Sequence, residues 1–336
     1  LELFRQDVQD HRDARYGWTA YSRPRLKIGF FQLKTVGQLT GCDWRKDLWN
    51  AELTGTITTD RGTIRIRHLT HAIDMVVATE LTPDEGESGF SWTWYPHPAE
   101  TTRPGYPTDD KSRQAYAERY GRQHIDAMEP WTPNPKGRLE PRGEVNVWVQ
   151  DLLAGGQYAT AWSQAQAGST RRHFVSIAKG YPEATAADTA VAEVERCAAS
   201  DRDRWIDAHR QWWHDYFSKS YVQLPDPQIE ALYWQTVYRL GCTSRAGRFY
   251  IDTSGLWFQG GSWAYTTHDW NTQAAHWGVY SANRLEQGRD LVDRLHRYQQ
   301  NLIESVRPRE WQEDCAYLAL ATVGDMIGER DGDMRY

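Results

Sequence analysis

The chain has 336 residues, a formal net charge of −6 and a mean hydropathy of −0.76. It contains neither a long basic run nor an apolar run of about 18 residues, so we expect no nucleic-acid partner and no membrane span. The four cysteines lie far apart and include no Cys-x-x-Cys pair, which argues against a disulfide framework and against a cysteine zinc site. We expect no cofactor and no metal.

The aromatic composition is unusual, with 17 Trp and 18 Tyr but only 8 Phe. Trp and Tyr combine a flat apolar face with a polar tip, which suits a surface that meets a partly polar ligand such as a sugar. Large proteins also bury Trp in their cores. Composition alone therefore leaves both interpretations open.

The first half of the chain has the pattern of short strands. Alternating apolar and polar residues predict strands at 51–59, 63–68, 74–80, 144–149, 158–162 and 173–178. Residues 60–62, Asp-Arg-Gly, predict a hairpin loop between the first two. The proline-rich stretch 96–142 is expected to be a long excursion with one short helix near 111–120. Short strands without intervening helices favour an antiparallel sandwich.

The second half has a helical pattern. Residues 184–217 contain neither Pro nor Gly, which predicts one or two helices. Asp226 before Pro227 predicts a capped helix start, with an inner apolar stripe from Ile229 to Leu240. Further helices are expected at 270–283, 285–306 and 311–326. The organisation predicted is therefore multi-domain, β then α: a β-sandwich at 1–182, a helical linker at 183–222, and part of a larger helical domain at 223–336.

The densest polar and aromatic cluster covers residues 255–277. Its glycines allow the backbone to approach a ligand, and its tryptophans can stack on sugar rings. Asp269 and Asn271 fall at a predicted helix start, where free N–H groups gather. A more ordinary interpretation is that Asp269 is a helix cap, that the tryptophans belong to the core and that His276 is a core histidine.

This order of domains resembles enzymes with an N-terminal β-super-sandwich and a catalytic (α/α)6 barrel, and most closely glycoside hydrolase family 95, which contains α-L-fucosidases and α-L-galactosidases. Three stretches carry the resemblance: residues 48–62, Gly255-Leu-Trp257, and Tyr265-Thr-Thr-His-Asp-Trp-Asn-Thr-Gln-Ala-Ala-His-Trp277. The last is similar to the family's Tyr-Thr-Thr-Asn-Ile-Asn-Leu-Gln-Met-Asn-Tyr-Trp. Asn271, Gln273 and Trp277 keep the family's identities, whereas Asp269 stands where the family has its first Asn.

The resemblance implies an inverting, exo-acting glycosidase for an α-linked sugar such as an α-L-fucoside or α-L-galactoside, within an oligosaccharide or polysaccharide substrate. Asp269 and Asn271 would position or deprotonate the attacking water. The general acid is expected on a later barrel helix, beyond Tyr336. Within the chain Glu313 is the candidate, with Glu310 and Asp314 beside it, although a charged helix start facing solvent is the favoured explanation of these three residues. The candidate sugar contacts are Trp257, Trp263, His268, Trp270, Gln273 and His276.

Three alternatives stay open. A phosphorylase has the same domain order, and a polysaccharide lyase combines the same elements, commonly with the helical domain first. A sugar-binding protein without catalytic activity would keep the tryptophans and lack the acid. We expect a secreted or periplasmic location.

Overall fold

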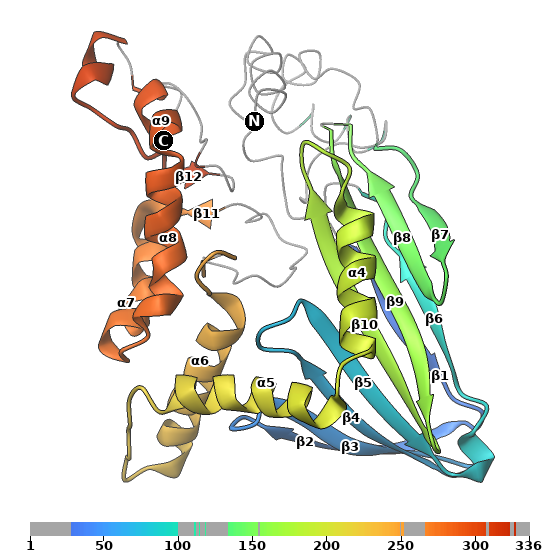
Figure 1. Ribbon diagram of the computed structural model, residues 1–336. Coiled ribbons are helices and arrows are strands. Elements are labelled where there is room, and N and C mark those ends of the chain that lie inside the picture. The colour runs from blue at the N-terminus through green and yellow to red at the C-terminus, as the bar shows by residue number, and fades with distance from the viewer. Residues whose placement is uncertain are drawn as a thin grey trace. The chain divides into compact units, whose positions relative to one another are not determined.

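The computed structural model describes residues 28–99, 134–153, 155–248, 250–251, 266–306, 309–322 and 326, and the isolated positions 111, 114 and 118. The chain divides into two compact units (Figure 1). The sheet unit comprises Ile28–Ala99 and Pro133–Ser218, and the described helices from Lys219 onward belong to the helical unit. Most of the predicted excursion at 96–142, with its short helix, lies outside the described residues. No helix in the described part of the chain is long and apolar enough to cross a membrane.

An eight-stranded antiparallel sheet forms the body of the sheet unit, in the order β2–β3–β4–β5–β10–β9–β8–β7. Its strands are β2 (Leu39–Asp47), β3 (Glu52–Thr59), β4 (Thr63–Thr70), β5 (Val76–Pro83), β7 (Arg138–Arg142), β8 (Val145–Asp151), β9 (Gln157–Ala167) and β10 (Thr170–Gly180). All six predicted strands are present, and so is the hairpin at 60–62, where Thr59 N donates to Gly62 O over 2.9 Å. Strand β7 departs from the prediction, which places residues 138–142 in the polar excursion.

A two-stranded layer, β1 (Gly29–Lys34) paired with β6 (Ser91–Pro96), packs on one face of this sheet through aromatic side chains. The Phe31 ring lies 4.7 Å from the His173 ring on β10 and 5.2 Å from the Trp162 ring on β9, between ring centroids. Trp92 stacks on His173 at 5.0 Å. Aromatic burial therefore holds the two layers together.

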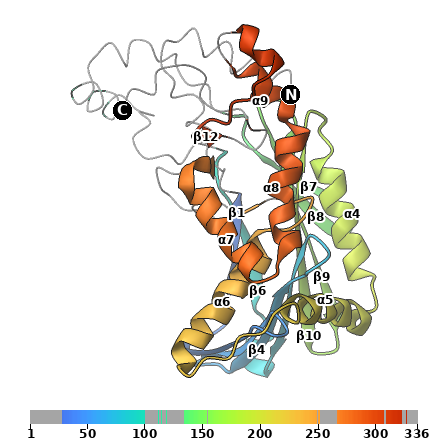
Figure 2. The same cartoon turned by 90° about the vertical axis from the view of Figure 1, so that its left-hand side faces the viewer.

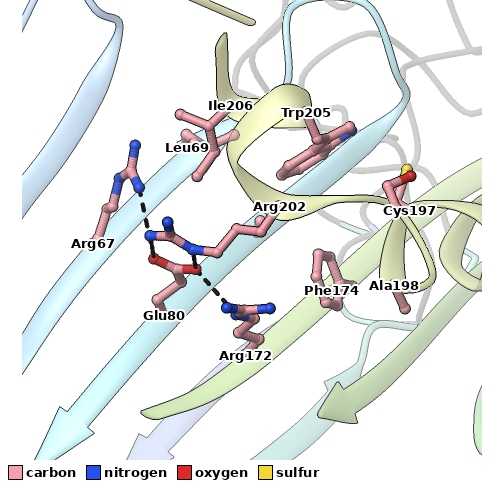
Figure 3. Close-up of a pocket in the computed structure, with 12 residues that line it drawn as sticks. Arg67, Leu69, Glu80, Arg172, Phe174, Cys197, Ala198, Arg202, Trp205 and Ile206 are labelled. Carbon is pink, nitrogen blue, oxygen red and sulfur yellow. Dashed lines mark hydrogen bonds and ion pairs between the residues drawn. The ribbon is translucent and has the colours of Figure 1, made fainter. Parts of the chain in front are cut away.

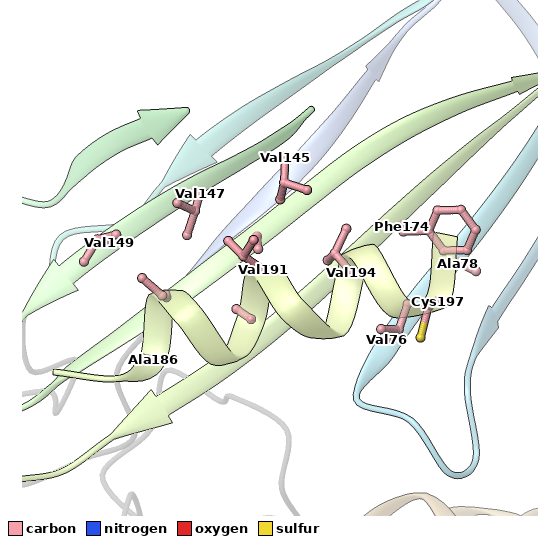
Figure 4. Close-up of a cluster of buried hydrophobic side chains, with 14 of the residues drawn as sticks. Val76, Ala78, Val145, Val147, Val149, Phe174, Ala186, Val191, Val194 and Cys197 are labelled. Carbon is pink, nitrogen blue, oxygen red and sulfur yellow. The ribbon is translucent and has the colours of Figure 1, made fainter. Parts of the chain in front are cut away.

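Helix α4 (Ala186–Ala198) covers the opposite face of the large sheet (Figure 4). Val145, Val147 and Val149 alternate along β8 and are buried with Val194 of α4 in one apolar cluster. Complete burial of such a valine contributes about 1.5–3 kcal/mol. The buried residues of α4 recur with the period of a helix, and the buried residues of β8 alternate as in a strand. Each element therefore buries one face.

Helix α5 (Arg202–Phe217) follows α4 in the same unit, and a buried histidine of α5 forms hydrogen bonds with the loops around Asn50 and Ala72. His209 Nδ1 accepts a hydrogen bond from Ala72 N over 2.9 Å, and Nε2 donates to Asn50 O over 3.0 Å. Burial, aided by nearby His71, lowers the pKa of His209 to about 4. The residue is therefore neutral at pH 7, in agreement with its two contacts.

The helical unit contains α6 (Pro227–Thr243), α7 (Gln273–Ser281), α8 (Leu285–Arg297) and α9 (Gln299–Glu304) (Figure 2). The predicted cap is present, because Asp226 Oδ1 accepts from Gln228 N over 2.8 Å and Pro227 is the first helical residue. The buried apolar stripe predicted for α6 is present only toward its C-terminal end. Leu240 near its C-terminal end is buried, whereas Ile229 is 56% exposed.

The helix predicted at 311–326 is wrong. A short 3-10 helix spans Arg309–Glu313, and the chain then extends to β12 (Ala321–Thr322), which pairs with β11 (Thr266–Thr267). Tyr317 N donates to Leu302 O of α9 over 2.9 Å, which fixes the extended path. Ala and Leu have high helix propensity, but long-range pairing overrides a preference of a few tenths of a kcal/mol per residue.

Candidate functional site

The candidate site is the segment that runs from β11 through one irregular turn, His268–Thr272, into α7. Its start is anchored by the later chain: Thr266 pairs with Thr322, and His268 N donates to Leu320 O over 2.7 Å. Residues about fifty positions apart therefore support each other. Nothing local in the sequence indicated that Leu320 and Thr322 would lie here.

The turn itself has a strained backbone. Asp269 has φ −63° and ψ 119°, and Trp270 has φ 48° and ψ −44°, so both leave the helical region. A bulky side chain at positive φ is a conformational outlier that costs about 1–3 kcal/mol, and such residues cluster at functional sites. The turn presents Asp269 and Trp270 to solvent and leaves Asn271 partly buried.

Asp269 does not cap the helix that follows. The N-cap position of α7 is Thr272, and the Thr272 hydroxyl donates to Thr267 O over 2.7 Å and accepts no hydrogen bond from a helix N–H group. The helix-cap interpretation of Asp269 is therefore not supported by the geometry. Its exposed carboxylate is accessible to a solvent water or a ligand.

Two exposed tryptophans belong to the same segment as Asp269, namely Trp270 on the turn and Trp277 on α7. The rings of Trp270 and Trp277 meet edge to face, with centroids 5.9 Å apart and an interplanar angle of 85°. Trp270 is 61% exposed and Trp277 is 59% exposed, so neither belongs to the core. Trp277 was matched to the family but was not among the predicted sugar contacts. No helical spacing in the sequence links it to Trp270, because Trp270 stands on the irregular turn before α7.

Both predicted histidines are buried beneath the turn. His268 Nε2 lies 2.7 Å from Thr322 Oγ1, and burial together with nearby His276 lowers the pKa of His268 to about 4. His276 Nδ1 donates to Thr272 O over 2.7 Å, and burial lowers the pKa of His276 as well. Both rings are therefore neutral at pH 7. They support the turn from below, whereas Asp269 and the tryptophans face outward.

One atom under the turn has an unmet hydrogen-bonding capacity. The carbonyl of Thr272 can only accept, so the neutral His276 ring carries its proton on Nδ1 and leaves Nε2 as an acceptor. This Nε2 atom is buried and has no hydrogen-bond partner among the described residues. A buried acceptor of this kind commonly accepts a hydrogen bond from a water or a ligand.

The remaining predicted residues lie elsewhere or outside the description. Trp257 and Trp263 are outside the described residues. Gln273 is exposed in the first turn of α7. Glu313 is exposed at the end of its 3-10 helix, which packs on α9, whereas the turn with Asp269 packs on α7, β11 and β12. Within the described ranges, no group of three or more His, Cys, Asp or Glu side chains could hold a metal ion.

No protein-family model matches the chain, and no curated protein sequence matches it. Among solved structures, the chain is similar to a bacterial glucoamylase complexed with acarbose, with a TM-score of 0.51 and 9% sequence identity. The match covers 93% of this chain and 48% of the glucoamylase, so the chain spans about half the length of that protein. These observations show a fold similar to that of part of the glucoamylase. They do not single out glycoside hydrolase family 95.

Proposed function

We propose that this chain is part of a glycoside hydrolase and that the segment from Thr266 to Trp277 forms one side of its sugar site. The observation that carries the proposal is the exposed Asp269 carboxylate on a strained turn beside the exposed Trp270–Trp277 pair. The glucoamylase-like fold supports the same class. In this proposal residues 1–182 form the sandwich domain, 183–222 the linker and 223–336 the first part of an (α/α)6 barrel.

The proposed mechanism is inversion at the anomeric carbon. Asp269 removes a proton from the attacking water, and the Asn271 amide orients that water. In family 95 the equivalent of Asp269 is an amide, which can position water but cannot take its proton. A carboxylate at this place is therefore a stronger base. The flat faces of Trp270 and Trp277 would contact the apolar C–H faces of the sugar.

The leaving oxygen needs a proton from a second carboxylic acid on the opposite side of the sugar. Inverting enzymes hold the two carboxyl groups about 6.5–9.5 Å apart, which leaves room for the water. We propose that this acid comes from a later barrel helix. Glu313 is the candidate within the present residues. We further propose an exo-acting enzyme on an α-linked sugar, with α-L-fucosides and α-L-galactosides first among the substrates to test.

The test is a substrate screen with the stereochemistry of the product as a readout. Aryl α-L-fucosides, aryl α-L-galactosides, aryl α-glucosides and malto-oligosaccharides are supplied, and the first-formed anomer is followed by proton NMR. The proposal predicts hydrolysis of an α-glycoside to the β-anomer. Turnover that requires phosphate would indicate a phosphorylase, and an unsaturated product that absorbs in the ultraviolet would indicate a lyase. Sugar binding without turnover would replace the hydrolase by a binding protein.

A further inference from the structure

A second group of polar residues lies in the sheet unit, on the same face that α4 covers. Strands β4, β5 and β10 are neighbours, and their register puts Arg67 opposite Glu80 and Glu80 opposite Arg172. In the next row Arg65 is opposite Thr82. The face is apolar under α4, where Phe174 and Ala78 pair, and becomes charged along the same strands.

Helix α5 adds a further guanidinium to this row (Figure 3). Arg202, the first residue of α5, forms a two-point ion pair with Glu80, with Nε 2.5 Å from Oε1 and Nη2 2.6 Å from Oε2. Arg172 Nε lies 3.2 Å from Glu80 Oε1, and this buried atom has no hydrogen-bond partner within the described ranges. Burial raises the pKa of Glu80, but hydrogen bonding and charge from Arg202, with Arg67 and Arg172, lower it overall. The Glu80 carboxylate thus forms ion pairs with three arginines.

The wider network keeps a positive excess. Arg67 is paired with Glu52, with Nε 2.8 Å from Oε2, and Glu52 also pairs with Arg210 at 2.8 Å. Asp203 pairs with Arg202. The cluster therefore contains five arginines (65, 67, 172, 202 and 210) against three carboxylates (52, 80 and 203), a net charge of +2. In the described part of the chain, no ion pair involves Arg65, which is exposed.

A cavity of about 280 Å³ opens over this excess charge. Four arginines line it (Arg65, Arg67, Arg172 and Arg202), with Glu80, Thr82 and Thr170. Thr82 Oγ1 and Thr170 Oγ1 are hydrogen bonded to each other at 2.7 Å. The N-terminal end of the 16-residue helix α5 adds the positive end of its dipole beside Arg202. The volume is just below the roughly 300–1,000 Å³ of typical small-molecule sites.

We propose that this cavity, the arginine pocket, binds a small oxyanion, either free or carried as the acid group of a sugar. The guanidinium group matches the two oxygens of a carboxylate, sulfate or phosphate, so Arg65 and Arg172 supply donors that the internal carboxylates leave unused. Glu80 fixes the arginine planes from below, and the two threonine hydroxyls offer neutral contacts at the edge. The pocket lies wholly in the sheet unit, so this inference does not depend on the proposed sugar site.

Isothermal titration calorimetry on the full chain at low ionic strength tests the pocket, with sodium phosphate, sodium sulfate and sodium glucuronate as probes and sodium chloride as the ionic-strength control. Three proteins are compared with the wild type: Arg65→Gln, Arg65→Gln with Arg172→Gln, and the matched control Arg45→Gln, which removes an exposed arginine from β2. Arg65→Gln breaks no ion pair in the described residues, so it keeps the test valid if the double variant folds poorly.

We expect saturable binding of at least one probe, weakened by about tenfold or more in Arg65→Gln and further in the double variant, and unchanged in Arg45→Gln. Tighter binding of glucuronate than of phosphate and sulfate assigns the pocket to sugar acids, and the reverse order assigns it to a free inorganic anion. Absence of saturable binding for all three probes overturns the proposal. An equal loss in Arg45→Gln also overturns it, because binding would then reflect general surface charge.

Discussion

The indole rings of Trp270, which precedes α7, and Trp277, which lies within α7, meet edge to face with their centroids 5.9 Å apart. Trp270 stands on a backbone with φ 48°, and Trp277 stands on regular helix. Both rings remain exposed and adjoin each other, and adjoining exposed apolar side chains mark interaction sites more often than isolated ones do. The pair therefore links the strained turn to a surface that can receive a sugar.

Replacing either tryptophan should weaken sugar binding. Trp270→Ala and Trp277→Ala are each expected to raise the KM for the substrate found in the screen by about tenfold, which corresponds to about 1.4 kcal/mol. The matched control is Trp44→Ala, which removes an exposed tryptophan from β2 of the sheet unit. Steady-state kinetics measure the effect. A KM for both site variants equal to that of Trp44→Ala would show that the pair does not contact substrate.

The strain at position 270 gives a stability prediction. Glycine adopts positive φ without steric cost, whereas alanine retains the Cβ atom that clashes there. Trp270→Gly should therefore be more stable to urea than Trp270→Ala by about 1 kcal/mol, the reverse of the usual order of these residues. If the alanine variant is equally stable or more stable, the turn does not have the positive φ that distinguishes it.

Much of the sheet unit was predictable because its buried strands alternate. Residues 63–68 and 145–149 show a period of two, and the structure has strands there. Strand β2 was missed because it is almost fully exposed along Leu39–Asp47, so no face selects apolar residues. The helix predicted at 311–326 failed for the opposite reason. Its local preference is helical, but its conformation is fixed by pairing with β11, which no local pattern encodes.

Acid should destabilise the sheet unit through His173. Burial lowers the pKa of His173 to about 4, from a usual value of 6.5. The unfolded chain then binds more protons between these two pH values, so stability falls as pH drops below 6.5 and levels off below 4. At pH 5 the expected loss from this group is about 2 kcal/mol relative to pH 7.5.

His173→Phe tests this account, because it keeps a ring against Phe31 and Trp92 and removes the titrating group. It also removes the Nε2 atom, which is buried without a hydrogen-bond partner among the described residues. Urea unfolding at pH 7.5 and pH 5 should show a smaller loss of stability in the variant. The same loss in both proteins would assign the acid sensitivity to other groups.

The N-terminal cap of α6 is predicted by the sequence and present in the structure. Asp226 Oδ1 accepts from two backbone N–H groups, those of Gln228 at 2.8 Å and Ile229 at 3.4 Å. Asp226→Ala should lower the free energy of unfolding by about 1 kcal/mol, within a range of roughly 0.5–2. Asp226→Asn keeps a side-chain acceptor and serves as the control. Equal losses in the two variants would show that the negative charge, not the hydrogen bond, stabilises this end.

The candidate site was predictable as a segment but not as a geometry. The concentration of polar and aromatic residues around Asp269, Trp270 and Asn271 indicated this segment as a site. The resemblance to family 95 implied a role for Asp269 and Asn271. The sequence could not show which residues of the segment are exposed and which are buried, because the turn at Trp270 interrupts the helical period. His268 and His276 were predicted as sugar contacts, and the structure places both under the turn, against Thr322 and Thr272.

The central claim is that Asp269 acts on the water that attacks the sugar. The measurement that tests it most directly is kcat for Asp269→Asn on the best substrate of the screen, with Asp207→Asn on the exposed surface of α5 as the control. We expect kcat to fall by about 10²–10⁴ in Asp269→Asn, with Tm unchanged because Asp269 does not cap α7. A kcat equal to that of the control would contradict the claim.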